Sequence, residues 1–247
     1  LENLYMVGDK TAQREHLFPT LVSGRPNPEA ARLEDQTRKI GGRGPVKGRP
    51  RRAWYTPSRL EVVDRLNEEG LLPSIFFIFS RNGCNEAAQS CLKQGLRLTS
   101  PDERKRIKEI IDSRLDDIDD DDLDVLGYPQ FVAQLEAGIA AHHAGMVPPF
   151  KETVEACFVE GLVKIVFATE TLAVGINMPA RSVVIEKLSK FTGEHHEFLT
   201  AGEFTQLTGR AGRRGLDDKG HAVVLWNPFV TFEQVAGLAS SRTFRLT

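Results

Sequence analysis

The sequence is poor in cysteine and has no long apolar run. Its three cysteines, Cys84, Cys91 and Cys157, lack the spacing of a zinc site, and an odd number without a secretory signal predicts reduced thiols in the cytoplasm. No apolar run approaches the roughly 20 residues that a membrane span requires, so we expect a soluble chain without a membrane partner. The formal charge of −2 neither indicates nor excludes a nucleic-acid partner.

Two motifs that bind a magnesium nucleotide are also missing. No Gly-Lys-Ser or Gly-Lys-Thr sequence occurs, and no Asp-Glu-x-His follows a predicted strand. The chain alone is therefore not expected to hold the phosphates and Mg²⁺ of ATP. The acidic run 116–124 lacks the glycine and closing glutamate of a calcium loop and is expected to be a solvated connector. The pair His142-His143 has neither an HExxH arrangement nor a nearby cysteine pair, so no metal site is predicted.

Composition divides the chain into four segments. Residues 1–22 contain one short apolar run and are predicted to enter from a preceding domain. Residues 23–57 are polar and basic, and we expect a disordered insertion there because little apolar surface would offset the ordering entropy. Residues 58–240 are predicted to form the folded domain. Residues 241–247 are expected to begin a linker to further domains.

Strands and helices alternate from residue 58 onward. A capping box at Ser58 predicts a helix, and the apolar run 74–79 predicts a strand buried on both faces. Asn82 is expected to cap the helix that follows. Further strands are predicted at 139–142, 164–169, 182–186 and 220–226. This order predicts an α/β fold with a doubly wound, mainly parallel sheet and with the functional loops along one edge.

Polar residues follow three of the predicted strands. Because carboxyl ends of parallel strands share one edge, we expect these residues to converge there. One histidine of the pair 142–143 is expected in the core and the other at the strand end. The residues are Ser80, Arg81, His143, Gly145, Thr169 and Thr171.

The stretch from Gln206 to Gly215 combines three glycines with three arginines. Glycine lets the backbone approach a ligand closely, and the guanidinium fork pairs bidentately with phosphate oxygens. A phosphate-binding loop is the favoured interpretation, and a solvated basic turn is the alternative. On either interpretation, an arginine on such a surface loop is expected to bury little.

Four segments in this order resemble motifs of superfamily 2 helicases. They are Ile75 to Arg81, His142 to Gly145, Val166 to Ala180, and Gln206 to Gly215, which has the pattern Q-x-x-G-R-x-G-R-x-G. The sequences of these segments are similar to those of the superkiller-type DExH-box RNA helicases, especially the bacterial HelY-type members. In that family this portion is the second RecA-like domain, with the fold of the P-loop NTPases. The P-loop lies on the first RecA-like domain.

The resemblance implies roles for individual residues. At the ATP site, it makes Arg213 the arginine finger, with Arg210 beside it and Gln206 near the same phosphate. Nucleotide contacts are further implied for Gly175, Asn177, Gly209 and Gly212. Nucleic-acid contacts are implied for Ser80, Arg81, His143, Gly145, Thr169 and Thr171.

The resemblance implies the C-terminal motor domain of a cytoplasmic, ATP-dependent RNA helicase. Its expected partners are single-stranded RNA, the first RecA-like domain and the downstream domains of the same protein. ATP and Mg²⁺ would be held largely by that first domain, so the chain alone is expected to be inactive. A DNA helicase domain and a nucleotide-independent nucleic-acid-binding module remain alternatives.

Overall fold

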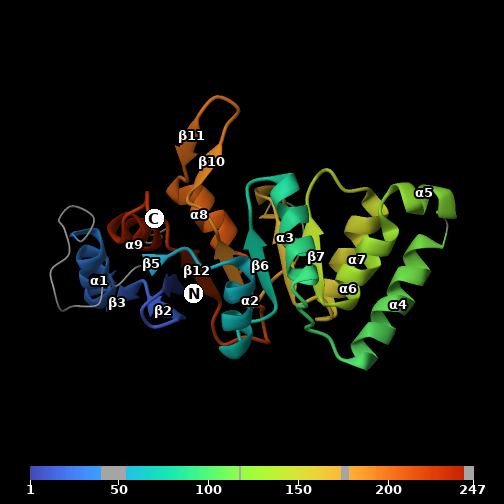
Figure 1. Cartoon of the computed structure of the whole chain (residues 1–247), viewed down its shortest axis with the longest axis horizontal. Helices are drawn as coiled ribbons and strands as arrows, with labels where there is room; N and C mark the ends of the chain where they lie inside the picture. The colour runs from blue at the N-terminus through green and yellow to red at the C-terminus, as the bar shows by residue number, and fades with distance from the viewer. Residues whose placement is uncertain (40–53, 117, 174–177, 242–247) are drawn as a thin grey trace.

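The computed structural model describes residues 1–39, 54–116, 118–173 and 178–241 (Figure 1). In these ranges the main sheet has eight strands in the order β2-β1-β12-β9-β6-β8-β7, with β5 beside β1. Their bounds are β1 Glu2–Asp9, β2 Arg14–Pro19, β5 Trp54–Tyr55, β6 Ser74–Phe77, β7 Ile139–His142, β8 Ile165–Ala168, β9 Ser182–Ile185 and β12 His221–Leu225. Neighbours from β1 through β7 are parallel, whereas β2 and β5 pair antiparallel with β1.

Helices cover both faces of this sheet, which confirms the predicted doubly wound α/β fold. Successive residues of β6 show the two faces, because Ile75 and Phe77 belong to one core cluster and Phe76 to the other. The face of Phe76 is covered by α2 Arg59–Glu68 and α3 Arg81–Lys93. The opposite core contains residues of α1 Pro28–Lys39, α4 Pro101–Leu115, α6 Tyr128–Glu136, α7 Pro148–Val159, α8 Ala201–Thr208 and α9 Phe232–Ser240. No helix in the described ranges is long and apolar enough to cross a membrane.

The amino-terminal segment forms part of the main sheet. Within residues 1–22, β1 lies inside the sheet, parallel to β12 and antiparallel to β2. Met6 and Val7 are fully buried in β1. The position of β1 in the sheet is set by its hydrogen bonds to β12, which lies near the other end of the described chain. A local sequence pattern cannot predict such a pairing.

The predicted disordered insertion at 23–57 is partly wrong. Residues 28–39 form α1, whose Ala30 and Leu33 are buried against the core. Two short strands, β3 Leu21–Val22 and β4 Arg25–Pro26, precede it. Most of the strongly basic stretch, residues 40–53, lies outside the described residues.

Three local details also differ. Ser80 rather than Asn82 caps α3, because its hydroxyl accepts from the Gly83 N–H at 3.1 Å. The acidic connector contains a short helix, α5 Asp120–Val125, with Leu123 buried. A hairpin of β10 Ser189–Phe191 and β11 His196–Phe198 projects beyond the sheet (Figure 1) and was not predicted.

Candidate functional site

The carboxyl ends of three neighbouring strands bring the predicted nucleic-acid residues to one edge. Phe77 of β6 lies opposite Ala168 of β8, which lies opposite His142 of β7. The residues that follow these strands therefore emerge side by side, as the spacing predicts. The order of the strands, with β8 between β6 and β7, arises from long crossovers and could not be inferred from the sequence.

Arg81, His143 and Gly145 form a compact group at this edge. A Cβ on Gly145 would lie 3.2 Å from His143 Nδ1 and 3.4 Å from Arg81 Cδ. Any larger side chain would thus displace one of these neighbours. Arg81 is exposed at the first position of α3, so its guanidinium is accessible to a ligand.

His143 is fixed on both sides of its ring. Its Nε2–H donates to Asn85 Oδ1 at 2.9 Å, and its Nδ1 accepts from the Gly145 N–H at 3.1 Å. Burial, together with the positive charge of Arg81, lowers the pKa of His143. The ring is consequently neutral at pH 7, and it positions Gly145 without adding charge to the edge.

The paired histidines both lie in the interior, which corrects the expectation that one is presented at the strand end. His142 is 2% exposed and His143 5%. They face opposite sides of the sheet, as adjacent strand residues should, because His142 pairs with Glu155 of α7 and His143 with Asn85 of α3. Burial lowers the pKa of His142 as well.

Two hydroxyl groups lie at the end of β8. The Oγ1 atoms of Thr169 and Thr171 are 2.9 Å apart, and the Thr169 N–H donates to the His142 carbonyl at 3.3 Å. Thr169 is buried, whereas Thr171 is exposed in a 3₁₀ turn, η2 Glu170–Ala173. Thr171 therefore presents the accessible hydroxyl, and Thr169 supports it.

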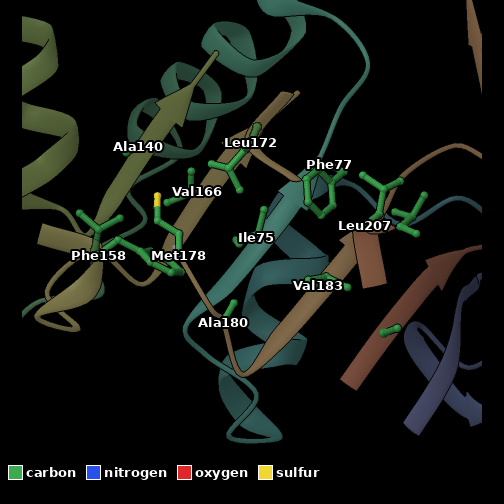
Figure 2. Close-up of a cluster of buried hydrophobic side chains, with 14 of the residues drawn as sticks. Ile75, Phe77, Ala140, Phe158, Val166, Leu172, Met178, Ala180, Val183 and Leu207 are labelled. Atoms are coloured by element: carbon green, nitrogen blue, oxygen red, sulfur yellow. The ribbon is translucent and has the colours of Figure 1, made fainter. Parts of the chain in front are cut away.

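The described chain resumes at Met178, just before the amino end of β9. Gly175 and Asn177 lie outside the described residues. Leu172, Met178 and Ala180 are fully buried and belong to the same core as Val166 and Ile75 (Figure 2). The described residues on both sides of 174–177 thus contribute to this core, and Ala180 lies at the amino side of β9.

The arginine-rich loop, residues 209–215, is bonded to Ala180, just before β9. The Ala180 N–H donates to the Arg210 carbonyl at 3.0 Å, and the Gly212 N–H donates to the Ala180 carbonyl at 2.7 Å. The loop therefore lies at the amino edge of β9 and β12. The expectation that all functional loops share one edge is wrong, because α8 carries the chain back along the sheet before the loop begins.

Close backbone packing fixes the position of this loop. A Cβ on Gly220 would lie 2.3 Å from the Ala211 carbonyl oxygen and 2.6 Å from the Gly212 nitrogen. Gly212 itself has a φ of +96°, which favours glycine. The loop thus requires glycine on both sides of the contact.

Arg213 is held by an aspartate that the sequence analysis missed. Its Nε and Nη2 donate to the two carboxylate oxygens of Asp217, each at 2.8 Å, and Arg181 Nε donates to the same carboxylate at 2.9 Å. The Arg213 hydrogen bonds hold the pKa of Asp217 well below its usual range. The Arg213 side chain is only 22% exposed, so the expectation that it buries little is wrong. The spacing of four residues between Arg213 and Asp217 was the available signal.

The other residues of the motif are more accessible. Gln206, Gly209 and Arg214 are exposed, and Arg210 is half-buried. Gln206 lies on α8, one turn or more before the loop. The structure therefore distinguishes the held Arg213 from its exposed neighbour Arg214.

A hollow lies beside Ser80, under the β10–β11 hairpin. It has a volume of about 280 Å³, and its charged lining residues are Arg59, Lys187, Lys190 and Glu186, which pairs with Arg59. Its aromatic lining residues are Phe77, Phe79, Phe191 and His196. The alternation from Ser189 to Phe198 around Gly193 was the sequence signal for this hairpin, and Gly193 has a φ of +102°.

Comparisons with known proteins show which family the chain resembles. Residues 115–215 match the family described as helicase conserved C-terminal domain. The chain is 58% identical over 219 residues to the probable helicase HelY of Mycobacterium tuberculosis, covering 88% of this chain and 24% of HelY. It is 34% identical over 226 residues to the exosome RNA helicase MTR4 of Homo sapiens, covering 91% of this chain and 20% of MTR4.

A plant relative shows the same similarity over a shorter range. The DExH-box ATP-dependent RNA helicase DExH11 of Arabidopsis thaliana is 40% identical over 166 residues, covering 67% of this chain and 12% of that protein. The chain thus spans 24% or less of the length of each of these three relatives. The resemblance to DExH-box and HelY-type helicases is confirmed.

Proposed function

We propose, on the premise that this chain belongs to the helicases through its conserved C-terminal domain, that it is the C-terminal motor domain of an ATP-dependent RNA helicase. The observation that supports this most strongly is the pair of backbone hydrogen bonds that joins Ala180 to the arginine-rich loop. In the sequence Ala180 follows closely on Thr169 and Thr171, the two hydroxyl residues at the end of β8. A short length of chain therefore connects the strand-end residues with the arginine-rich loop.

On the nucleotide side, Arg213 acts as the arginine finger toward the γ-phosphate. Its Nε and Nη2 bond Asp217, which leaves Nη1 to donate to a phosphate oxygen. Arg210 and Gln206 approach the same phosphate, and Gly209 and Gly212 allow close approach of the loop. Gly175 and Asn177 complete this set in the proposal, although they lie outside the described residues.

On the nucleic-acid side, the strand-end residues form a phosphate track. Arg81 supplies the charge, and Thr171, supported by Thr169, supplies an accessible hydroxyl. His143 fixes Gly145, which leaves room for a backbone to pass close to the protein. Ser80 borders the track beside the hairpin hollow.

The proposal assigns the magnesium ion and the P-loop to another domain of the same protein. In the described residues, no three His, Cys, Asp or Glu side chains gather as a metal site would require. Mg²⁺ bound in that other domain would neutralise charge on the β- and γ-phosphates of ATP. The residues of this chain would orient the γ-phosphate and stabilise its developing charge.

The test compares two proteins. This chain alone should hydrolyse no ATP, whereas a longer helicase that joins it to a P-loop domain should show ATPase activity stimulated by single-stranded RNA. Stimulation by DNA alone would favour a DNA helicase. Nucleic-acid binding with no dependence on nucleotide in the longer protein would favour a simple binding module.

A further inference from the structure

A pocket at the β7 edge of the sheet adjoins the proposed phosphate track. It has a volume of about 340 Å³, at the lower end of the range for small-ligand sites. His143 and Gly145 line it from the track side, and Gln134, Phe131 and Phe150 line it from α6 and α7. A ligand on the track therefore passes the mouth of this pocket.

The polar groups of this pocket include the carboxamide of Gln134, on α6. Gln134 is only 7% exposed, and no hydrogen bond joins its carboxamide to another described residue. Its nitrogen and oxygen are not sealed from solvent, so a ligand that entered the pocket would exchange their bonds to water for bonds of its own. Gln130 and Asn85 add two further carboxamides to the lining.

The remaining walls are apolar and aromatic. Phe131 and Phe150 are stacked, with ring centroids 4.1 Å apart and planes at 15°. The described lining contains no Asp, Glu, Lys or Arg, and His143 is neutral because burial lowers its pKa. The pocket therefore suits an uncharged, planar group with donors and acceptors along its edge.

We infer that this pocket binds one unstacked nucleobase of a single-stranded nucleic acid whose backbone lies on Arg81 and Gly145. Gln134 donates to and accepts from the edge of the base, and the apolar wall of Phe131, Phe150 and Met146 contacts the rest of it. Proteins commonly recognise splayed bases by this combination of amide hydrogen bonds and aromatic contact. The inference rests on the proposed function, because it requires nucleic acid on the track.

The experiment uses this chain with two fluorescent decamers, decauridine and the same ribose-phosphate backbone without bases. Gln134→Leu removes the amide and keeps the size of the side chain. We expect it to weaken binding of decauridine about threefold to tenfold and to leave the abasic decamer unaffected. Arg81→Gln should weaken both decamers, and Gln94→Leu, on an exposed glutamine at the far end of α3, should weaken neither.

Other outcomes separate the two proposals. If Gln134→Leu weakens both decamers equally or neither, while Arg81→Gln still weakens both, the pocket is wrong and the phosphate track stands. If the chain binds neither decamer, both are wrong. Photocrosslinking of the wild-type chain gives a second measurement. Under ultraviolet light, a decamer of 4-thiouridine should crosslink to peptides from residues 126–150, which include most of the pocket lining. Crosslinks only at the hairpin or at α3 would overturn the pocket.

Discussion

Arg213 and Asp217 form a two-point ion pair in which the guanidinium Nε and Nη2 donate to both carboxylate oxygens at 2.8 Å. The Arg213 backbone N–H also donates to this carboxylate, at 3.0 Å. Asp217 therefore fixes the main chain and the side chain of Arg213 together. An arginine finger acts through geometry, so the residue that orients it should affect catalysis without touching the nucleotide.

Asp217→Asn keeps the shape of the side chain but removes its charge. Because the Asp217 side chain is 2% exposed and its hydrogen bonds come from charged groups, the free energy of unfolding should fall by about 1.5–3 kcal/mol at pH 7. The lowered pKa of Asp217 means that this stability is fully present above the unfolded pKa, near 3.9, and is lost as the pH falls from there through the lower pKa of the folded state. Urea unfolding of this chain at pH 7 and pH 3 should therefore show a smaller difference between the two proteins at pH 3 than at pH 7. Asp218→Asn, on the exposed neighbour, is the matched control, and an equal loss there would contradict this account.

Arg213→Lys in the longer helicase tests the arginine finger. Lysine keeps the charge but loses the planar fork, so ATP turnover should fall about 10³-fold or more, roughly 4 kcal/mol of transition-state stabilisation. Some stability should also be lost, because lysine cannot bond Asp217 at two points. Turnover is therefore measured well below the unfolding temperature. Arg214→Lys changes an exposed side chain and should cost little, and equal losses at both positions would identify a structural basic turn.

Gly220→Ala tests whether backbone packing holds the arginine-rich loop in place. The added Cβ would meet the Ala211 carbonyl oxygen at 2.3 Å, and this atom belongs to the backbone, so the loop must move. We expect about 1–3 kcal/mol of destabilisation, measured by urea unfolding, together with weakened ATP turnover in the longer helicase. Gly237→Ala in α9 meets nothing within 4 Å and should be neutral or stabilising. Unchanged ATP turnover in Gly220→Ala would mean that the position of the arginine-rich loop does not affect catalysis.

Local patterns were sufficient to predict most elements of the fold. The continuous apolar run of β6 and the capping box at Ser58 act over a few residues, and the structure contains both of them. The burial of α1 was missed because its apolar residues, Ala30 and Leu33, are few and pack against distant elements. Sequence patterns therefore predicted the elements better than they predicted which of them pack together.

The arrangement of the candidate site depends on contacts between distant segments. The backbone bridge between Ala180 and Ala211 involves no side chain, so no residue type signals it. Likewise, the buried ring of His143 is held by a hydrogen bond to Asn85, which lies 58 residues earlier in the chain. The sequence could identify the motifs, but it could not show that they lie at opposite edges of the sheet.

Salt dependence tests the phosphate track. Each protein cation that neutralises a phosphate releases counterions from the nucleic acid. A plot of the logarithm of the association constant against the logarithm of the salt concentration should therefore be a falling line, with a slope of about −0.7 for each phosphate contact to a single strand. Arg81→Gln should therefore weaken the binding of different single-stranded RNA sequences about equally and lower the slope by roughly this amount. The slope is obtained from titrations of this chain between low and moderate salt.

The matched control for Arg81 is Lys93→Gln. Lys93 lies in the last turn of the same helix, away from the carboxyl edge of the sheet, so its removal changes the net charge by the same amount without removing a contact. It should lower the affinity only slightly and leave the slope unchanged, because a distant charge acts through a screened field. Binding that is insensitive to salt, or an equal change of slope in both variants, would show that Arg81 contributes only to the overall charge and does not contact a phosphate.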